Sequence, residues 1–245
     1  WSTGARTSII SLDGLVGSLY ANSPFQFDVR SDGNYVVQGY TGNFRSELRL
    51  YYASTGGLFG GPIQLGASTD FMDVVVNPDD SMYALTRRYT GSAYAYSVNH
   101  YDSSGNLLGS QADFFTSSDW NALNSIEVFG GQMHLLGGNT YANYFKGTMA
   151  SLTGVPGSYW LTGNYHEMMH GHTGESYFLQ SWSDAGVPAT RIYYRHPQGN
   201  GFFGTYASLP NGINYGSAVM VTAPEPATMV ALAAGAAFFL RRRRK

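Results

Sequence analysis

A short glycine-containing segment recurs along the chain at a nearly constant spacing, and this repeat constrains the fold more than any other feature. Each copy has a polar turn, a Gly or Asn, two mostly apolar residues and a closing glycine. The closing glycines are Gly17, Gly60, Gly109, Gly157 and Gly204. They lie 43, 49, 48 and 47 residues apart, so we expect the chain to be built from equivalent structural units of about 47 residues.

A second element follows the hairpin in each unit. It has an apolar run that contains one acidic residue, then a turn, then a second run of alternating apolar and polar residues. The acids that align between units are Asp28, Asp73, Glu127 and Glu167. Asp-Gly at residues 32–33 and Gly-Gly at residues 130–131 favour tight hairpin turns, because these residues tolerate positive φ.

The pattern within each unit therefore predicts four antiparallel strands. Four strands in roughly 40–50 residues are typical of a β-propeller blade. We expect an all-β, propeller-like body of about five four-stranded blades, plus a C-terminal hydrophobic helix. The N-terminal copy is interpreted as the outer half of a closing unit, and residues 213–222 as its inner strand. A two-sheet β-sandwich is the alternative fold. The predicted strands are 27–31, 34–40, 72–76, 82–88, 125–129, 132–137, 166–170 and 176–182.

Cysteine content and charge exclude several classes of function. The chain has no cysteine, so disulfides and thiolate metal sites are excluded. The last five residues are all basic, which leaves nine of the 14 basic residues in residues 1–240, against 16 acidic ones. An acidic body argues against nucleic-acid binding, because cationic side chains must replace the counterions of the phosphates.

The C-terminal residues form a distinct segment. Residues 227–240 are uncharged and mostly apolar, and a basic cluster follows them directly. The cluster consists of Arg241, Arg242, Arg243, Arg244 and Lys245. The apolar run is shorter than the roughly 20 residues of a relaxed bilayer span, but the cluster is typical of a membrane anchor that ends in the cytoplasm. We expect a helix within about residues 227–243, with a buried C-terminal helix as the alternative.

Pro224, Glu225 and Pro226 precede this segment, and the whole arrangement resembles the PEP-CTERM sorting signal of Gram-negative bacteria that produce exopolysaccharide. The same tail is also called the ice-binding protein C-terminal domain. The resemblance implies export, retention in the membrane, and processing by an exosortase near the Pro-Glu-Pro element. It divides the chain into a body, residues 1–222, and a sorting and anchor segment, residues 223–245. Because no signal peptide precedes Trp1, we interpret the sequence as a mature form or a fragment.

The stretch "NYHEMMHGHTGESYF", residues 164–178, contains the H-E-x-x-H pattern of zinc peptidases at His166, Glu167 and His170. Such a site needs a helix, because one helical turn brings the two imidazoles to the same metal. The repeat instead aligns Glu167 with Asp73 on a strand, where residues four apart lie about 13 Å from each other. We therefore predict a strand here, and we expect neither a metal site nor a cofactor.

The aligned acids have two interpretations. They could line a central channel and bind a cation, or they could accept hydrogen bonds from backbone N–H groups at the strand starts, which we favour. The segment "DSSGN", residues 102–106, has the composition of a calcium loop but lacks the closing glutamate. The sequence has no nucleophile elbow, phosphate loop or dinucleotide fingerprint, and no catalytic residue is assigned.

Segments such as "YYASTGG" and "YAYSVNHYD" predict a surface rich in Tyr, Asn and Ser, which suits stacking on sugar rings. With the tail, this favours a non-catalytic binding or structural component of the extracellular polysaccharide matrix or the cell envelope. The alternatives are an extracellular glycan hydrolase or lyase and, third, a zinc peptidase. The expected partners are an exosortase-type enzyme, the membrane through the C-terminal segment, and extracellular polysaccharide.

Overall fold

The part of the chain that the structure describes is all-β. In this computed structural model the described residues are 15–16, 26–41, 46–52, 54–138, 143–154, 164–170, 176–184, 187–195 and 203–208. Every regular element among them is a strand, and these residues contain no helix. The all-β prediction is therefore confirmed for this part of the chain. The helix predicted within residues 227–243 lies outside the described residues.

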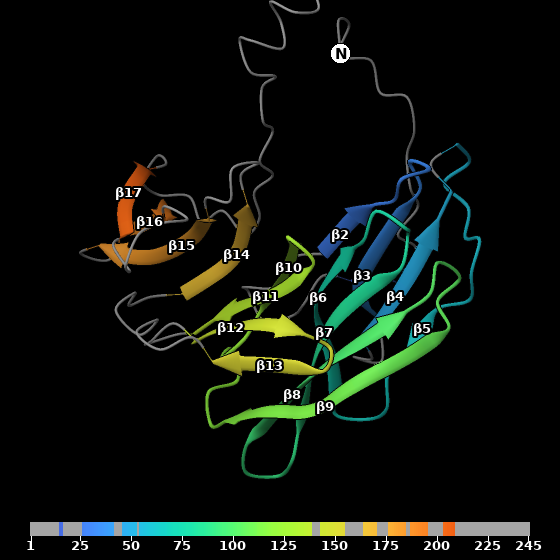
Figure 1. The fold of residues 1–245 in the computed structure, drawn as a ribbon, viewed down its shortest axis with the longest axis horizontal. Coiled ribbons are helices and arrows are strands. Elements are labelled where there is room, and N and C mark those ends of the chain that lie inside the picture. Colours follow the sequence, from blue (N-terminus) through green and yellow to red (C-terminus); the bar gives the residue numbers. More distant parts are fainter. Residues whose placement is uncertain are drawn as a thin grey trace, which may run out of the picture.

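The strands form four antiparallel sheets that follow one another along the chain (Figure 1). The first sheet contains β1 (Leu15–Val16), β2 (Gln26–Val29), β3 (Tyr35–Thr41), β4 (Ser46–Tyr51) and β5 (Ile63–Gln64). The second contains β6 (Thr69–Val76), β7 (Met82–Tyr89), β8 (Tyr94–Tyr101) and β9 (Leu107–Ser117). The third contains β10 (Ser125–Phe129), β11 (Gln132–Gly137), β12 (Asn143–Thr148) and β13 (Ser151–Gly154). The fourth contains β14 (Asn164–His170), β15 (Ser176–Asp184), β16 (Val187–Arg195) and β17 (Phe203–Ser208).

The hairpin turns lie where the sequence predicted them. The predicted strands 125–129 and 132–137 are β10 and β11, and the Gly-Gly pair between them has φ of 59° and 73°. Gly33 in the β2–β3 turn has φ of 80°. A side chain with a Cβ is strained at these angles, so the glycines allow the tight reversals.

The two described residues of the N-terminal repeat copy do not lie where the prediction placed them. We expected it to supply the outer half of a closing unit, yet Leu15 and Val16 pair with Thr41 and Tyr40 of β3. β3 is longer than β2, which covers only its first residues. β1 therefore satisfies backbone groups on the edge of β3 that β2 leaves open.

The core lies between the faces of neighbouring sheets. Met82 and Ala84 of β7 are completely buried against the first sheet, where they pack with Val36 and Leu48. Leu85, on the opposite face of the same strand, is completely buried against the third sheet with residues such as Leu135. Alternate residues of a strand point to opposite faces, so β7 supplies both interfaces.

We call β2, β6, β10 and β14 the first strands of the four sheets, leaving aside the two-residue β1, and these strands are neighbours in series. β2 contacts β6, β6 contacts β10, and β10 contacts β14 (Figure 1). The second sheet buries both of its faces, whereas each sheet of a two-sheet sandwich buries only one. The arrangement therefore differs from the sandwich alternative. A closed ring of about five blades stays a prediction, because the described residues form four sheets.

Candidate functional site

The aligned acids all lie on the first strands of their sheets. Asp28 is in β2, Asp73 in β6, Glu127 in β10 and Glu167 in β14. Since these strands contact one another in series, the repeat alignment identified equivalent positions along the line where the sheets meet.

The carboxylates of Asp28 and Asp73 connect neighbouring first strands. Asp28 accepts a hydrogen bond from the N–H of the next residue at 2.7 Å and another from the N–H of Val76 in β6, also at 2.7 Å. Asp73 repeats this pattern at 2.8 Å, with the next residue and with Ile126 in β10. Burial raises the pKa of Asp28, and these backbone bonds oppose the increase. For these two acids, the predicted role as acceptors for backbone donors is confirmed.

The H-E-x-x-H motif lies on a strand that carries a β-bulge. β14 covers Asn164–His170, and its register with β15 shifts at His166, directly before Glu167. The register of β6 with β7 shifts at Met72, directly before Asp73. The fourth sheet and the second sheet therefore have the same register shift, one residue before the aligned acid, and in the fourth sheet this shift lies within the motif. The predicted strand is confirmed, and these residues do not form the helix of a zinc peptidase.

The predicted sorting residues cannot be placed in the fold. Pro224, Glu225, Pro226 and the basic cluster at residues 241–245 lie outside the described residues. The repeat copy at residues 213–222 lies outside them as well.

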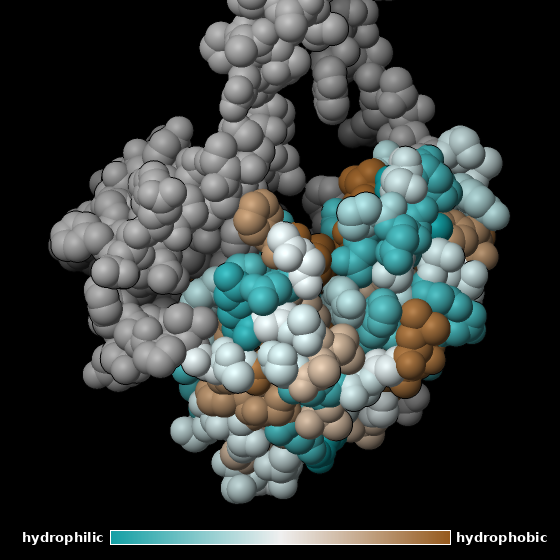
Figure 2. Space-filling view, in the orientation of Figure 1, coloured by the Kyte–Doolittle hydropathy of each residue, from teal (hydrophilic) through white to brown (hydrophobic). Residues whose placement is uncertain are grey.

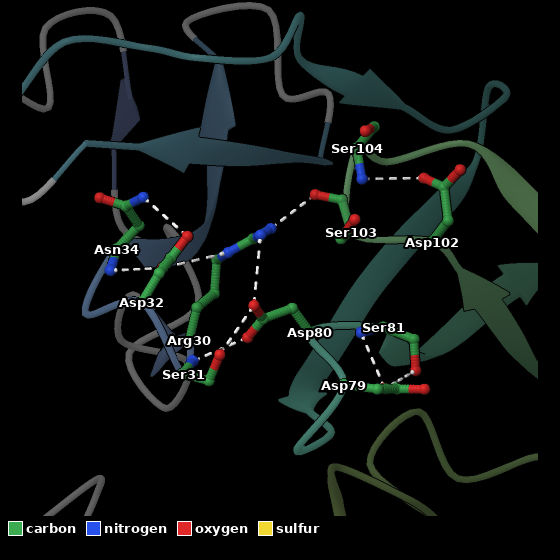
Figure 3. Close-up of polar contacts among 10 residues, drawn as sticks. All are labelled: Arg30, Ser31, Asp32, Asn34, Asp79, Asp80, Ser81, Asp102, Ser103 and Ser104. Atoms are coloured by element: carbon green, nitrogen blue, oxygen red, sulfur yellow. Dashed lines mark hydrogen bonds and ion pairs between the residues drawn. The ribbon is translucent and has the colours of Figure 1, made fainter.

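Three five-residue turns come together between the first and second sheets (Figure 3). They are residues 30–34, 77–81 and 102–106. In each turn the N–H of the first residue donates to the carbonyl of the fifth, and the N–H of the fourth donates to the carbonyl of the first. The fourth residue has positive φ in every case: 80° at Gly33, 63° at Asp80 and 88° at Gly105. The three turns thus share one backbone conformation, although one has Asp where the others have Gly.

An aspartate stabilises each of these turns internally. Asp32 accepts the N–H of Asn34 at 2.9 Å, and Asp79 accepts the N–H of Ser81 at 3.1 Å. Asp102 accepts two backbone N–H groups of its own turn, at 2.8 and 2.9 Å. The segment with calcium-loop composition therefore uses its carboxylate to form a hairpin turn.

Hydrogen bonds lower the pKa of these three carboxyls. The pKa of Asp32 is lowered mainly by the backbone of Asn34, and that of Asp79 mainly by the Ser81 hydroxyl. The pKa of Asp102 is lowered mainly by the side chain of Asn106. Within the described residues no three His, Cys, Asp or Glu side chains are arranged to hold a metal ion.

The guanidinium of Arg30 links the three turns (Figure 3). Its side chain is 8% exposed. Nη1 donates to the Ser103 carbonyl at 2.5 Å, Nη2 lies 3.6 Å from Asp80, and Nε lies 3.5 Å from Asp32. Asp80 also accepts the N–H and the hydroxyl of Ser31, at 2.7 and 2.9 Å. We call these five residues the Arg30 cluster.

A second buried arginine lies at the other end of β7. Arg87 Nη2 is 2.7 Å from Asp70 Oδ2, and Nη1 donates to the Trp120 carbonyl at 2.5 Å. Its guanidinium lies over two rings, 5.3 Å from the centroid of Tyr94 and 5.5 Å from that of Trp120. Tyr89 packs on Tyr94 at 5.2 Å. We call these five residues the Arg87 cluster.

A half-exposed tyrosine belongs to the Arg87 cluster, and another lies next to the Arg30 cluster. Tyr89 is 47% exposed and is tilted by 45° against Tyr94. Tyr52 is 46% exposed and is tilted by 45° against Phe59, whose ring lies 5.0 Å below the guanidinium of Arg30. The sequence predicted aromatic side chains on the surface but did not identify either arginine. The rarity of basic residues could have drawn attention to these arginines, since residues 1–240 contain only nine basic residues.

The comparisons with known proteins give different results for the tail and for the rest of the chain. No curated protein matches the chain. Two solved structures of a polysaccharide lyase of a new family, the PL25 ulvan lyase, align with it at 10% sequence identity and a TM-score of 0.41. One of them is bound to -[GlcA(1-4)Rha3S]-. Each alignment covers 77% of this chain but only 56% of the lyase, so the chain spans little more than half of that protein.

The C-terminal resemblance is confirmed. A model of the PEP-CTERM protein-sorting motif matches residues 222–245. Among the described residues, which exclude this tail, the structure has no helix that is both long and apolar enough to cross a membrane. The body has no recognised family. The chain therefore carries a PEP-CTERM protein-sorting motif and is an exported, sorted bacterial surface protein.

Proposed function

We propose that the protein is a non-catalytic component of the extracellular polysaccharide matrix or cell envelope, and that its body binds glycan. The observation that carries this proposal is the sorting motif at residues 222–245, because it directs the body to the cell surface. The contacts of the aligned acids also support it. Asp28 and Asp73 each use both carboxylate oxygens for backbone donors, so neither has the open coordination of a general acid or base.

We further propose that the tail acts as the resemblance implies. Residues 1–222 form the exported body, and residues 223–245 form the sorting and anchor segment. An exosortase-type enzyme of a Gram-negative bacterium recognises Pro224, Glu225 and Pro226. The apolar run is held in the membrane, and the basic residues 241–245 remain on the cytoplasmic side.

The arrangement of the four described sheets supports a propeller-like body. These four sheets do not by themselves form a closed ring. Their first strands contact one another in series, and their outer strands continue away from that line (Figure 1). We propose that residues beyond β17, including 213–222, complete a fifth unit.

Retention on purified extracellular polysaccharide tests the function. The full-length protein, kept in detergent, is passed over immobilised polysaccharide from a bacterium that sorts proteins by this signal. We expect retention that soluble polysaccharide reverses, with no shortening of the polymer after prolonged incubation. Absence of retention would contradict the binding proposal. Shortening of the chains would show that the protein is a glycan hydrolase or lyase.

A further inference from the structure

The exposed ring of Tyr89 is held in one orientation. Its hydroxyl donates to the carbonyl of Gly91 at 2.6 Å, and its ring contacts that of Tyr94 at 5.2 Å between centroids. Tyr94 in turn contacts the guanidinium of Arg87, which also lies 5.5 Å from the Trp120 ring. A ring that is already ordered loses little conformational entropy when a ligand stacks on it. The Arg87 cluster therefore presents a rigid aromatic surface.

Asp70 adds a hydrogen-bond acceptor to this surface. Its Oδ2 is bound to Arg87, and among the described residues its Oδ1 has no partner. The Asp70 side chain is 26% exposed. In the Arg30 cluster the corresponding carboxylate, Asp80, has both oxygens engaged by Ser31 and Arg30. Only the Arg87 cluster therefore combines an exposed ring with an open acceptor.

The charges around the Arg87 cluster favour an uncharged ligand. Arg87 is paired with Asp70, and the neighbouring Arg88 is paired with Asp113 at 2.6 Å. An anionic sugar would find no unpaired cation among these groups. It would also be repelled by a body whose first 240 residues carry nine basic and 16 acidic side chains.

We infer that the Arg87 cluster is a subsite for a neutral hexose unit of a polysaccharide. The apolar face of the sugar stacks on Tyr89, and a hydroxyl of the same or the adjoining sugar donates to Asp70 Oδ1. This inference rests on the proposed glycan-binding function and names the place and the class of sugar that the body recognises.

Tyr52 provides a matched control. It has nearly the same exposure as Tyr89, the same tilt against a second ring and an arginine behind that ring. Among the described residues, both oxygens of the carboxylate paired with that arginine, Asp80, are engaged. The full-length protein is titrated calorimetrically with cellohexaose, mannohexaose and, as the anionic probe, hexagalacturonate. We expect Tyr89→Ala to weaken binding of a neutral hexamer by roughly fivefold to tenfold, as expected for loss of one stacked ring. Asp70→Asn is expected to weaken binding as well, whereas Tyr52→Ala remains within about twofold of the wild type.

Several results would overturn the inference. Equal losses in the Tyr89→Ala and Tyr52→Ala variants would show that no subsite lies at the Arg87 cluster, while the glycan-binding function would stand. Tighter binding of hexagalacturonate than of both neutral hexamers would show that the sugar class is wrong. Retention on whole polysaccharide without any effect of Tyr89→Ala would place binding elsewhere on the body. Thermal unfolding of each variant confirms that a loss of binding is not a loss of fold.

Discussion

At the scale of single residues, the buried charges depend on partners from different sheets. Arg30 follows β2, Asp80 precedes β7, and Ser103 lies in the turn before β9. Removing one partner from a buried ion pair is costly, because the remaining charge keeps its desolvation penalty. Arg30 is therefore expected to stabilise the interface between the first two sheets most strongly when the Asp80 carboxylate is present as its partner.

Substitutions of Asp80 test both its pairing with Arg30 and its positive φ in the turn at residues 77–81. Asp80→Asn keeps a residue type that tolerates positive φ but removes the charge, so we expect a loss of about 1–2 kcal/mol of unfolding free energy. Asp80→Ala also leaves alanine at a φ of 63° and is expected to cost about 2–4 kcal/mol. Urea unfolding followed by circular dichroism measures both.

Asp113 is the control for the Asp80 series. It also has positive φ, at 49°, and pairs with Arg88, but both side chains are about half exposed. Asp113→Asn should cost less than about 1 kcal/mol, because exposed ion pairs contribute little. Equal costs for the two Asn variants would contradict a structural role for the Arg30 cluster.

Two aspartates should respond to pH in opposite directions. The pKa of Asp102 is lowered by the hydrogen bonds of its turn, so its stabilisation is present above an ordinary carboxyl pKa and is lost on acidification. The pKa of Asp28 is raised by burial, so the folded state binds that proton more tightly and gains stability on acidification. Relative to the wild type, Asp102→Asn should become less destabilising towards about pH 3, and Asp28→Asn more destabilising. Urea unfolding between about pH 3 and pH 7 measures both trends, and profiles of the same sign would refute this assignment.

At the scale of elements, some glycines allow close backbone approach whereas others only mark the repeat. Gly137 ends β11, and a Cβ there would meet the backbone of Leu123 and would lie 2.7 Å from the N atom of Asn124. Gly109, a closing glycine of the repeat, has no atom within 4 Å of such a Cβ. The repeat spacing therefore does not reveal which glycine is needed for packing.

Gly137→Ala should destabilise the third sheet. The added methyl group meets backbone atoms that cannot rotate away, so we expect a loss of about 1–3 kcal/mol. Gly109→Ala is expected to change stability by less than about 0.5 kcal/mol. Thermal unfolding of the two variants measures the contrast, and similar effects would mean that the backbone shifts to accept the methyl group.

The strand at residues 164–170 leads to a prediction about metal binding. His166 and His170 should not share a zinc ion, because a strand holds residues four apart at about 13 Å rather than one helical turn. Elemental analysis after dialysis should find no stoichiometric zinc, and His170→Ala should leave the metal content unchanged. One zinc per chain that is absent from this variant would restore the peptidase interpretation.

At the scale of the whole molecule, the sheets form a series in which each packs on the next. The first strands provide the continuous contacts, and the Asp28 and Asp73 carboxylates bridge successive first strands. In such an arrangement stability comes from interfaces between neighbouring units. Among the residues whose burial the structure describes, the exposed large apolar side chains are few. Figure 2 shows a hydrophobic area over the start of β9, where Leu107 and Leu108 are 58% and 59% exposed.

Deleting residues 224–245 should separate sorting from folding. We expect the truncated protein to be released into the medium, because the sorting motif is lost, and to keep its thermal transition. Cell fractionation and calorimetry measure the two outcomes. Loss of the transition would show that the tail belongs to the core and would contradict the anchor proposal.

The sequence alone determined the features that depend on local physics. Alternating side chains and residues that tolerate positive φ decide where strands and turns lie, so β10, β11 and the turn between them matched closely. The same reasoning placed the H-E-x-x-H motif on a strand and the aligned acids on equivalent strands. The tail motif was identified because its order of residues is itself the signal.

Only the tertiary structure decided which distant groups meet. The pairing of β1 with β3, the bond from Val76 to Asp28, and the meeting of Arg30 with Asp80 and Ser103 all join segments that are separated in the sequence. The same is true of Arg87 beside Trp120. Such contacts depend on how neighbouring sheets pack. The local sequence around an arginine does not predict which distant residue it will contact. The packing of neighbouring sheets therefore decides which carboxylates bridge two strands and which residues form the two arginine clusters.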